Sequence, residues 1–233
     1  MTIRSLAIVL LLFVSSAPAA EQTGKHTFQA AGLRRTFYLY SPAMSADTPP
    51  PLLLALHGSH GRAEDMIESW MPIAGAAGLM VVAPVARQPA AWQIRADGPQ
   101  FMRALVDEVE RLHPIDRRRI YLFGYSGGAV FALTLSMLES EHFAATAVYA
   151  GAWRQPNEFI AVPHARRAIP VAIFVGERDE YFRLHDVRKT YEVLQEAGHP
   201  SNLTILPGRT HSYGNVAREV NEAAWDWLKV YRS

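Results

Sequence analysis

One serine stands between glycines in the stretch "RIYLFGYSGGAV", residues 119–130. Gly124, Ser126 and Gly128 have the spacing G-x-S-x-G, with one apolar run before them and another after them. In the pattern known as the nucleophile elbow, the serine lies on a sharp turn from strand to helix that exposes its hydroxyl above the edge of a sheet. The pattern predicts that Ser126 is a nucleophile. A glycine-rich turn that happens to contain a serine is the alternative at this point.

A serine of this kind needs a base and an orienting carboxylate, because its hydroxyl is a weak nucleophile until its proton is accepted. Where the elbow occurs, the chain order is Ser, then Asp or Glu, then His. Of the histidines after Ser126, only His211 lies just past a strand-like segment, in "LTILPGRTHSYG". We therefore expect His211 to be the base, the alternative being an exposed loop histidine. The histidines set aside on position are His142, His164, His185 and His199.

The acid should also follow a strand, and "PVAIFVGERDEY" places three carboxylates after one. Asp179 is the favoured residue by its place in the loop. Glu177 and Glu180 compete with it, since the sequence does not measure which side chain reaches the histidine. A solvated cluster of charges is the alternative.

Acyl transfer also needs two backbone N–H groups for the oxyanion, and losing one such donor costs roughly 10²–10³ in rate. One donor comes from the residue after the nucleophile, Gly127. The stretch "LLLALHGSHG" fits the second, because Ser59 follows a buried strand and can present its amide. We interpret His57 as a structural loop residue and His60 as an exposed one.

Strand-like and helix-like segments alternate, which predicts an α/β fold with a mostly parallel, doubly wound sheet covered by helices on both faces. In such sheets ligands bind where loops leave the carboxyl ends of the strands, and Ser126 lies at one of those ends. The segment 33–40 alternates as an outer antiparallel strand does, and 85–97 is predicted to be a long surface loop. The other predicted strands are 52–56, 79–83, 120–123, 144–149, 171–175 and 203–206. The predicted helices are 63–77, interrupted at Pro72, and 100–113, 129–138, 184–197 and 216–231.

Residues 1–20 have the features of a secretory signal peptide. Arg4 supplies a positive charge, residues 6–14 are apolar, and residues 17–19 read Ala-Pro-Ala. The apolar core is shorter than the roughly 20 residues of a membrane span. We expect cleavage near Ala19 or Ala20, and a secreted or periplasmic protein.

Residues 21–233 are predicted to form a single domain, since this length suits one α/β unit. The 233 residues include 23 Lys+Arg and 22 Asp+Glu, so removal of Arg4 leaves 22 of each. This balance does not favour nucleic acid or an anionic membrane as a partner. The chain contains no cysteine, and its histidines lack the paired spacing of metal ligands. We expect no disulfides, no metal and no cofactor; the glycosylation sequon at Asn202 is a pattern frequent by chance.

These stretches together resemble the secreted α/β-hydrolase esterases of the polyhydroxybutyrate depolymerase, feruloyl esterase and acetyl xylan esterase group. The matching segments are "LLLALHGSHGRAEDM", "GLMVVAPVA", "DGPQFMRALVDEVERLHPIDRRRIYLFGYSGGAVFAL", "VAIFVGERDEY" and "RTHSY". The resemblance implies a triad of Ser126, Asp179 and His211, with Ser59 and Gly127 as the oxyanion hole. The chain departs from the group in having Ser59 where a cysteine is common, and Gly-Tyr-Ser-Gly-Gly at the elbow.

The expected function is hydrolysis of short-chain or aromatic carboxylic esters, small or oligomeric, through an acyl-enzyme. A peptidase or amidase on the same fold and a non-catalytic binding protein are the alternatives. Trp92, Trp153 and Tyr213 are candidate substrate-binding residues, because loops that we place near the site carry them; packing anchors are the other interpretation.

Overall fold

A computed structural model describes residues 20–43 and 48–233 of the chain. The predicted signal peptide, apart from Ala20, lies outside the described residues. Within the described part, no helix is long and apolar enough to cross a membrane.

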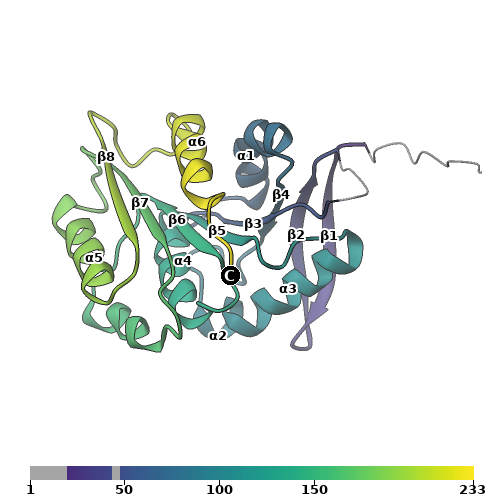
Figure 1. Cartoon of the computed structure of the whole chain (residues 1–233), viewed down its shortest axis with the longest axis horizontal. Helices are drawn as coiled ribbons and strands as arrows, with labels where there is room; N and C mark the ends of the chain where they lie inside the picture. The colour runs from purple at the N-terminus through teal and green to yellow at the C-terminus, as the bar shows by residue number, and fades with distance from the viewer. Residues whose placement is uncertain (1–19, 44–47) are drawn as a thin grey trace, which may run out of the picture.

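The strands of the described residues form one eight-stranded sheet in the order β1-β2-β4-β3-β5-β6-β7-β8 (Figure 1). β1 pairs antiparallel with β2 and β2 antiparallel with β4, whereas all the other pairs are parallel. The mostly parallel α/β-hydrolase sheet predicted from the sequence is therefore confirmed. The strands are β1 (Gln22–Ala30), β2 (Leu33–Ser41), β3 (Leu52–Leu56), β4 (Met80–Pro84), β5 (Ile120–Tyr125), β6 (Ala145–Tyr149), β7 (Val171–Gly176) and β8 (Ser201–Leu206).

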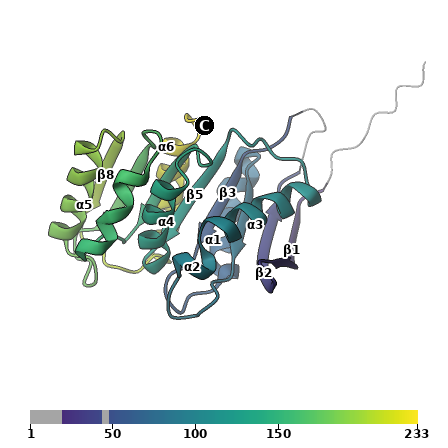
Figure 2. The same ribbon diagram turned by 90° about the horizontal axis from the view of Figure 1, so that it is seen from below.

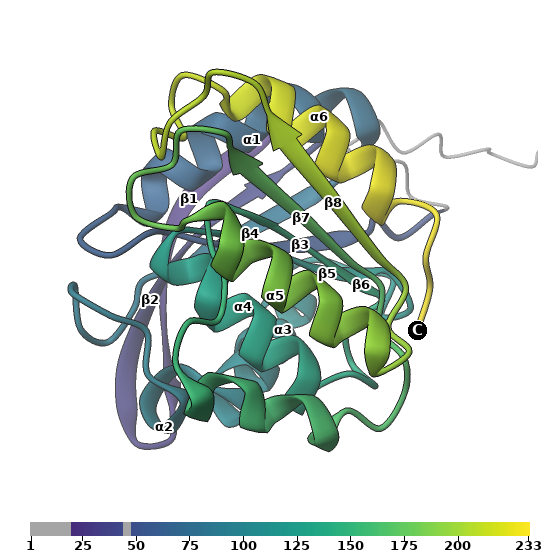
Figure 3. The same ribbon diagram turned by 90° about the vertical axis from the view of Figure 1, so that its left-hand side faces the viewer.

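Helices cover both faces of this sheet. Figure 3 shows α1 and α6 on one face and α3, α4 and α5 on the other, and Figure 2 views the second layer from below. The longer helices are α1 (Ala63–Ala77), α3 (Pro99–Leu112), α4 (Gly127–Leu138), α5 (Leu184–Glu196) and α6 (Ala217–Leu228). The short α2 (Ile94–Asp97) and the 3₁₀ helix η1 (Pro156–His164) lie in connections.

The apolar strand β3 shows why both faces must be covered. Its side chains alternate, so that Leu52, Leu54 and Leu56 belong to the core under α3 and α4. Leu53 and Ala55 belong to the core under α1 and α6. All five residues are fully buried, as expected for a parallel strand that packs on both sides.

Some sequence-based element predictions need correction. Segment 33–40 forms the predicted antiparallel strand as β2, but it is not at the edge of the sheet, because β1 lies outside it and joins it through a tight turn at Ala31 and Gly32, both with positive φ. The predicted loop 85–97 ends in α2, and η1 (Pro156–His164) was not among the predicted elements.

Helix α1 does not break at Pro72, which lies inside it. Proline has no N–H, so the carbonyl of Glu68 lacks its helical partner. Glu68 and Pro72 are both exposed. Water can therefore satisfy that carbonyl, which explains why the helix continues.

The order of the central strands creates the place for a site. From β3 the chain moves to β4 on one side, whereas β5 to β8 follow on the other side. The loops after β3 and β5 thus leave neighbouring strands at the point where the winding reverses, which is where sheets of this kind bind ligands. Ser59 lies in the first loop and Ser126 in the second.

Candidate active site

Ser126 occupies the turn between β5 and α4 in a conformation that few residues adopt, with φ 54° and ψ −119°. The two glycines of the elbow permit it. A Cβ on Gly124 would lie 2.6 Å from the carbonyl carbon of Gly128. A Cβ on Gly128 would lie 2.5 Å from the carbonyl oxygen of His57 and closer still to that of Leu56. The tight crossing of strand and helix therefore excludes side chains at both positions, and this observation favours an elbow over an ordinary glycine-rich turn.

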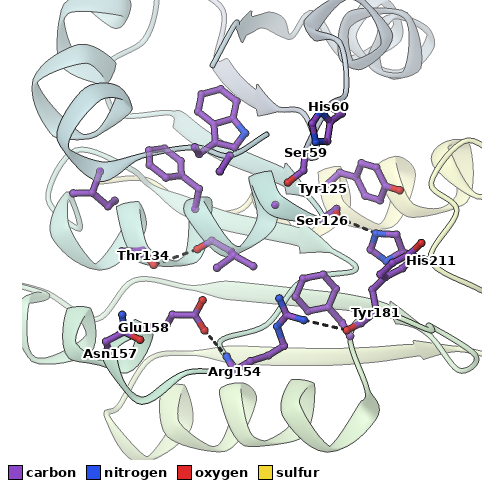
Figure 4. A pocket seen from close by; sticks show the side chains of 18 residues that line it. Ser59, His60, Tyr125, Ser126, Thr134, Arg154, Asn157, Glu158, Tyr181 and His211 are labelled. Carbon is purple, nitrogen blue, oxygen red and sulfur yellow. Dashed lines mark hydrogen bonds between the residues drawn. The ribbon is translucent and has the colours of Figure 1, made fainter. Parts of the chain in front are cut away.

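The structure brings Ser126, His211 and Asp179 together in one line of hydrogen bonds. Figure 4 shows the contact between Ser126 and His211. His211 Nε2 lies 2.9 Å from Ser126 Oγ. Its Nδ1 lies 3.1 Å and 3.0 Å from the two oxygens of Asp179. Because a carboxylate only accepts, Nδ1 carries the proton of the neutral imidazole and Nε2 is free to accept the serine proton.

Asp179 is buried, and its surroundings favour its charged form. Burial by itself raises the pKa of this carboxyl. Hydrogen bonds from His211 and from the backbone amides of Phe182 and Tyr181, at 2.8 and 2.9 Å for the amides, outweigh that effect and lower the pKa below its ordinary value. Asp179 is thus held as a carboxylate facing the imidazole.

The two competing carboxylates serve the backbone of the same region. Glu177 Oε2 accepts a hydrogen bond from the amide of Gly208 at 2.8 Å. Glu180 Oε2 accepts one from the amide of His211 at 3.2 Å. Both residues therefore act on the loop that carries the base, and Asp179 is the carboxylate that lies against the ring.

Gly127 and Ser59 lie opposite each other beside the nucleophile. A Cβ on Gly127 would be 2.5 Å from Ser59 Oγ and 3.3 Å from Ser59 N. Neither backbone amide has an acceptor among the residues that the structure describes. Two unused donors at this position are what an oxyanion would need.

Aromatic rings enclose His211 on several sides. The ring centroids of Tyr181, Tyr125 and Phe182 lie 4.7, 5.4 and 5.8 Å from the imidazole centroid. The guanidinium of Arg154 lies 4.6 Å above the Phe182 ring. These contacts hold the imidazole in place and leave its Nε2 edge toward Ser126.

The triad opens into a cleft of about 780 Å³. Trp92, Ile94 and Phe131 form an apolar wall. The rings of Trp92 and Phe131 are stacked, with their centroids 5.3 Å apart. Thr134 and Asn157 are among the polar groups at the end of the cleft away from the triad, as Figure 4 shows. The cleft can thus take an apolar group beside Ser126 with a polar group beyond it.

Of the three predicted substrate-binding residues, the structure places only Trp92 in the cleft. Trp153 is fully buried and its indole N–H donates to Thr134 Oγ1 at 3.1 Å. Tyr213 is buried, and its hydroxyl donates to Asn221 Oδ1 at 2.6 Å. Both are packing anchors, so the prediction that they bind substrate was wrong: the loops that carry them do reach the site, but these side chains turn into the core.

Several cleft residues escaped the sequence analysis. Tyr181 and Phe182 lie two and three residues after Asp179, so their place in the chain could have indicated them. Phe131 is one apolar residue among many in α4. Arg154 precedes the unpredicted η1 and Asn157 lies in it, so no pattern in the sequence singles these residues out.

Three histidines outside the triad bear on earlier predictions about the site. His57 is buried, with Nδ1 2.8 Å from the Gly58 carbonyl and Nε2 accepting from the Ala86 amide at 3.3 Å. His199 is buried and accepts from the Ile169 amide. His60 is exposed at the rim of the cleft. Among the described residues, no cluster of three or more His, Cys, Asp or Glu could hold a metal ion.

Comparison with known proteins adds a family and several relatives. Residues 86–231 match the model of the dienelactone hydrolase family. A bifunctional acetylxylan esterase/xylanase of Neocallimastix patriciarum is 28% identical over 160 residues, which are 67% of this chain and 23% of that protein. A putative esterase of Nocardia uniformis subsp. tsuyamanensis is 31% identical over 163 residues, 64% of this chain and 46% of that protein. The chain therefore spans less than half of the length of either relative.

The fold agrees with these matches. The crystal structure of a thermostable esterase superposes with a TM-score of 0.71 at 20% identity, over 91% of this chain and 63% of that one. At this level of identity the likeness shows the fold alone.

Proposed function

Because the chain belongs to the dienelactone hydrolase family of α/β-hydrolases, we propose that it is a serine esterase that cleaves carboxylic esters through an acyl-enzyme on Ser126. The observation that carries the proposal is the 2.9 Å contact between His211 Nε2 and Ser126 Oγ, with the Asp179 carboxylate on the other side of the imidazole. Two esterases among the relatives support the same chemistry.

In the acylation half of this mechanism, Ser126 Oγ attacks the carbonyl carbon of the ester while its proton passes to His211 Nε2. The carbonyl oxygen becomes an oxyanion facing the amides of Ser59 and Gly127. When the tetrahedral intermediate collapses, the bond to the alcohol oxygen breaks and His211 returns the proton to the leaving alcohol. The acyl group stays on Ser126.

Deacylation repeats these steps with water. A water molecule gives a proton to His211 Nε2 and attacks the acyl carbon, and the second collapse breaks the bond to Ser126 Oγ. The proton returns to that oxygen, and the carboxylic acid leaves. Asp179 remains ionised throughout and stabilises the imidazolium in both halves.

We further propose that the enzyme prefers short-chain or compact aromatic acyl groups. The apolar wall of Trp92, Ile94 and Phe131 can cover a small acyl group, whereas Thr134 and Asn157 lie beyond it. Each methylene adds up to about 0.8 kcal/mol of binding only where it meets an apolar surface. A long alkyl chain would run from the apolar wall into polar surroundings, so we expect kcat/KM to be highest for acetyl to butyryl or compact aromatic esters. We also propose that the N-terminal segment directs export, a role that rests on its sequence alone.

The test of the proposed function is Ser126→Ala, measured with p-nitrophenyl esters of increasing acyl length and with a fluorophosphonate probe. The parent should hydrolyse the short esters and be labelled at Ser126, whereas the variant should lose essentially all turnover and all labelling. Ser212→Ala is the matched control, because it removes an exposed hydroxyl one residue from His211. Turnover of Ser126→Ala within tenfold of the parent would rule out the serine mechanism, and highest activity on long acyl chains would rule out the proposed preference.

A further inference from the structure

We propose that the loop 85–97 positions the oxyanion donor of Ser59 and that Trp92 is the positioning residue which links the two, a role that presupposes the serine esterase function proposed above. This loop contributes Trp92 and Ile94 to the wall of the cleft. Its hydrogen bonds indicate a second role, because they end on the residues next to Ser59.

We call residues 57–61 the oxyanion loop. The loop 85–97 forms hydrogen bonds with it on both sides of Ser59. The indole N–H of Trp92 donates to the His57 carbonyl at 2.8 Å. The amide of His60 donates to the Pro89 carbonyl at 2.7 Å. Ser59 is thus the centre of a short segment whose two ends are fixed to the same neighbouring loop.

The segment needs this external support, because its own backbone is strained. The amide of Gly61 donates to the Gly58 carbonyl at 2.9 Å and closes a tight turn around Ser59 and His60. Within it His60 has φ 58°, a region that disfavours residues with a Cβ. Backbone of this kind persists only where its surroundings hold it. The Ser59 amide has no acceptor among the described residues, so its direction depends on the bonds of its neighbours.

The loop 85–97 is itself closed at its base by a buried ion pair. Arg35 from β2 and Asp97 are 4% and 0% exposed, and their closest atoms are 2.6 Å apart. The Asp97 carboxylate also accepts from the amides of Arg87 and Gln93, at 2.9 and 3.0 Å. Arg35 in turn donates to the Ala96 carbonyl at 2.8 Å. The two ends of the loop are therefore tied together, and its tip is a firm support.

Trp92 connects this support with the oxyanion loop. Its ring lies 4.8 Å from the His57 ring and stacks on Phe131 at 5.3 Å. A residue that only walls the cleft binds the ground state and the transition state alike, so its loss raises KM. A residue that directs an oxyanion donor acts in the transition state, so its loss lowers kcat.

The experiment is Trp92→Phe, which keeps an aromatic ring against Phe131 and removes the N–H that holds the His57 carbonyl. With a p-nitrophenyl acetate substrate we expect kcat to fall at least tenfold and KM to stay within twofold, since a misplaced donor forfeits part of the roughly 10²–10³ that one donor supplies. The affinity for a trifluoromethyl ketone, whose adduct with Ser126 carries an oxyanion, should fall by a similar factor. Trp225→Phe on α6 is the matched control, because Trp225 packs on Tyr121 and does not line the cleft. It should leave both constants within twofold.

A normal kcat for Trp92→Phe, or a raised KM with unchanged kcat, would overturn the positioning role. Ser126→Ala measured beside it separates the two levels of the proposal. An inactive Ser126→Ala with a normal Trp92→Phe would refute only the role of the loop, whereas an active Ser126→Ala would refute the esterase mechanism itself.

Discussion

In the proposed mechanism each of three side chains has its own role. Ser126 supplies the hydroxyl, His211 accepts its proton, and Asp179 supplies the negative charge that faces the ring. The carboxylate can be buried because the amides of Tyr181 and Phe182 and the imidazole all donate to it. Its burial without these donors would favour the neutral acid, which could not stabilise an imidazolium.

Replacement of Asp179 by asparagine should lower kcat by about 10⁴, because an amide neither fixes the productive tautomer of the imidazole nor stabilises its charge. Glu177→Gln and Glu180→Gln are the matched controls in the same loop. Each glutamine keeps an oxygen that can accept from the backbone amide its glutamate now serves, so each should cost far less. Steady-state kinetics on a short ester would decide, and the assignment of the acid is wrong if Glu177→Gln is the damaging change.

The decrease of kcat/KM toward low pH should correspond to the uptake of a single proton by the enzyme. Since the pKa of Asp179 is lowered, this carboxyl stays ionised as the pH falls below neutrality. Under the proposed mechanism we therefore expect the loss of activity to come from protonation of the general base alone. A plot of log kcat/KM against pH should therefore fall with a slope of one on its acid side, for an ester that does not hydrolyse by itself. A flat profile between about pH 5 and 8 would speak against a histidine base, and a slope of two would show a second essential proton.

At the level of elements, the site depends on how closely β5 and α4 approach the end of β3. Gly128 lies at the point of closest approach, where a side chain would meet the carbonyl oxygens of Leu56 and His57. Those atoms belong to the strand and loop that lead to Ser59. One close contact thus sets both the elbow and its distance to the oxyanion loop.

Gly128→Ala should destabilise the protein by about 1–3 kcal/mol or more, because the atoms in the way are backbone and do not move as a side chain would. Gly214→Ala is its control: a Cβ there meets nothing within 4 Å. We expect that control to change the free energy of unfolding by less than about 0.5 kcal/mol. Denaturant unfolding of both variants checks the difference, and equal stabilities would show that the close approach at Gly128 is not a real constraint.

At the level of the whole molecule, the described fold buries two histidines that are not part of the triad. Burial lowers the pKa of His57 and of His199 below the ordinary value. The unfolded chain therefore takes up protons first as the pH falls through about 6.5, and the native state does so only at lower pH. The stability present above about pH 6.5 is consequently lost on acidification, until the folded pKa values are passed.

The free energy of unfolding should accordingly fall between pH 7 and 5, and His199→Asn should reduce that fall. Asparagine can still accept from the Ile169 amide, as His199 Nδ1 does at 3.0 Å, but it does not titrate. His185→Asn, at an exposed histidine, should leave the pH dependence as in the parent. Urea unfolding at several pH values measures both slopes, and identical slopes for His199→Asn and the parent would refute the contribution of His199.

Local patterns were enough to predict the fold class and to select the serine and the histidine that the structure brings together. The G-x-S-x-G spacing, the chain order of serine, acid and histidine, and the apolar runs of β3, β5 and β7 all depend on neighbours in the chain. A parallel strand buried on both faces must be apolar throughout, so the sequence of β3 alone indicates its place. The elbow glycines are likewise required by contacts that any strand–turn–helix of this sharpness makes.

Tertiary structure alone decided what depends on distances between loops. Glu177, Asp179 and Glu180 have similar chemistry within four residues, and only the path of the loop after β7 shows that Asp179 faces the imidazole. Trp92, Trp153 and Tyr213 are all aromatic residues in connections, yet one lines the cleft and two point into the core. The direction of a side chain in an irregular loop has no period, so it is set by long-range contacts such as the bond from Trp92 to the His57 carbonyl, which the order of residues does not reveal.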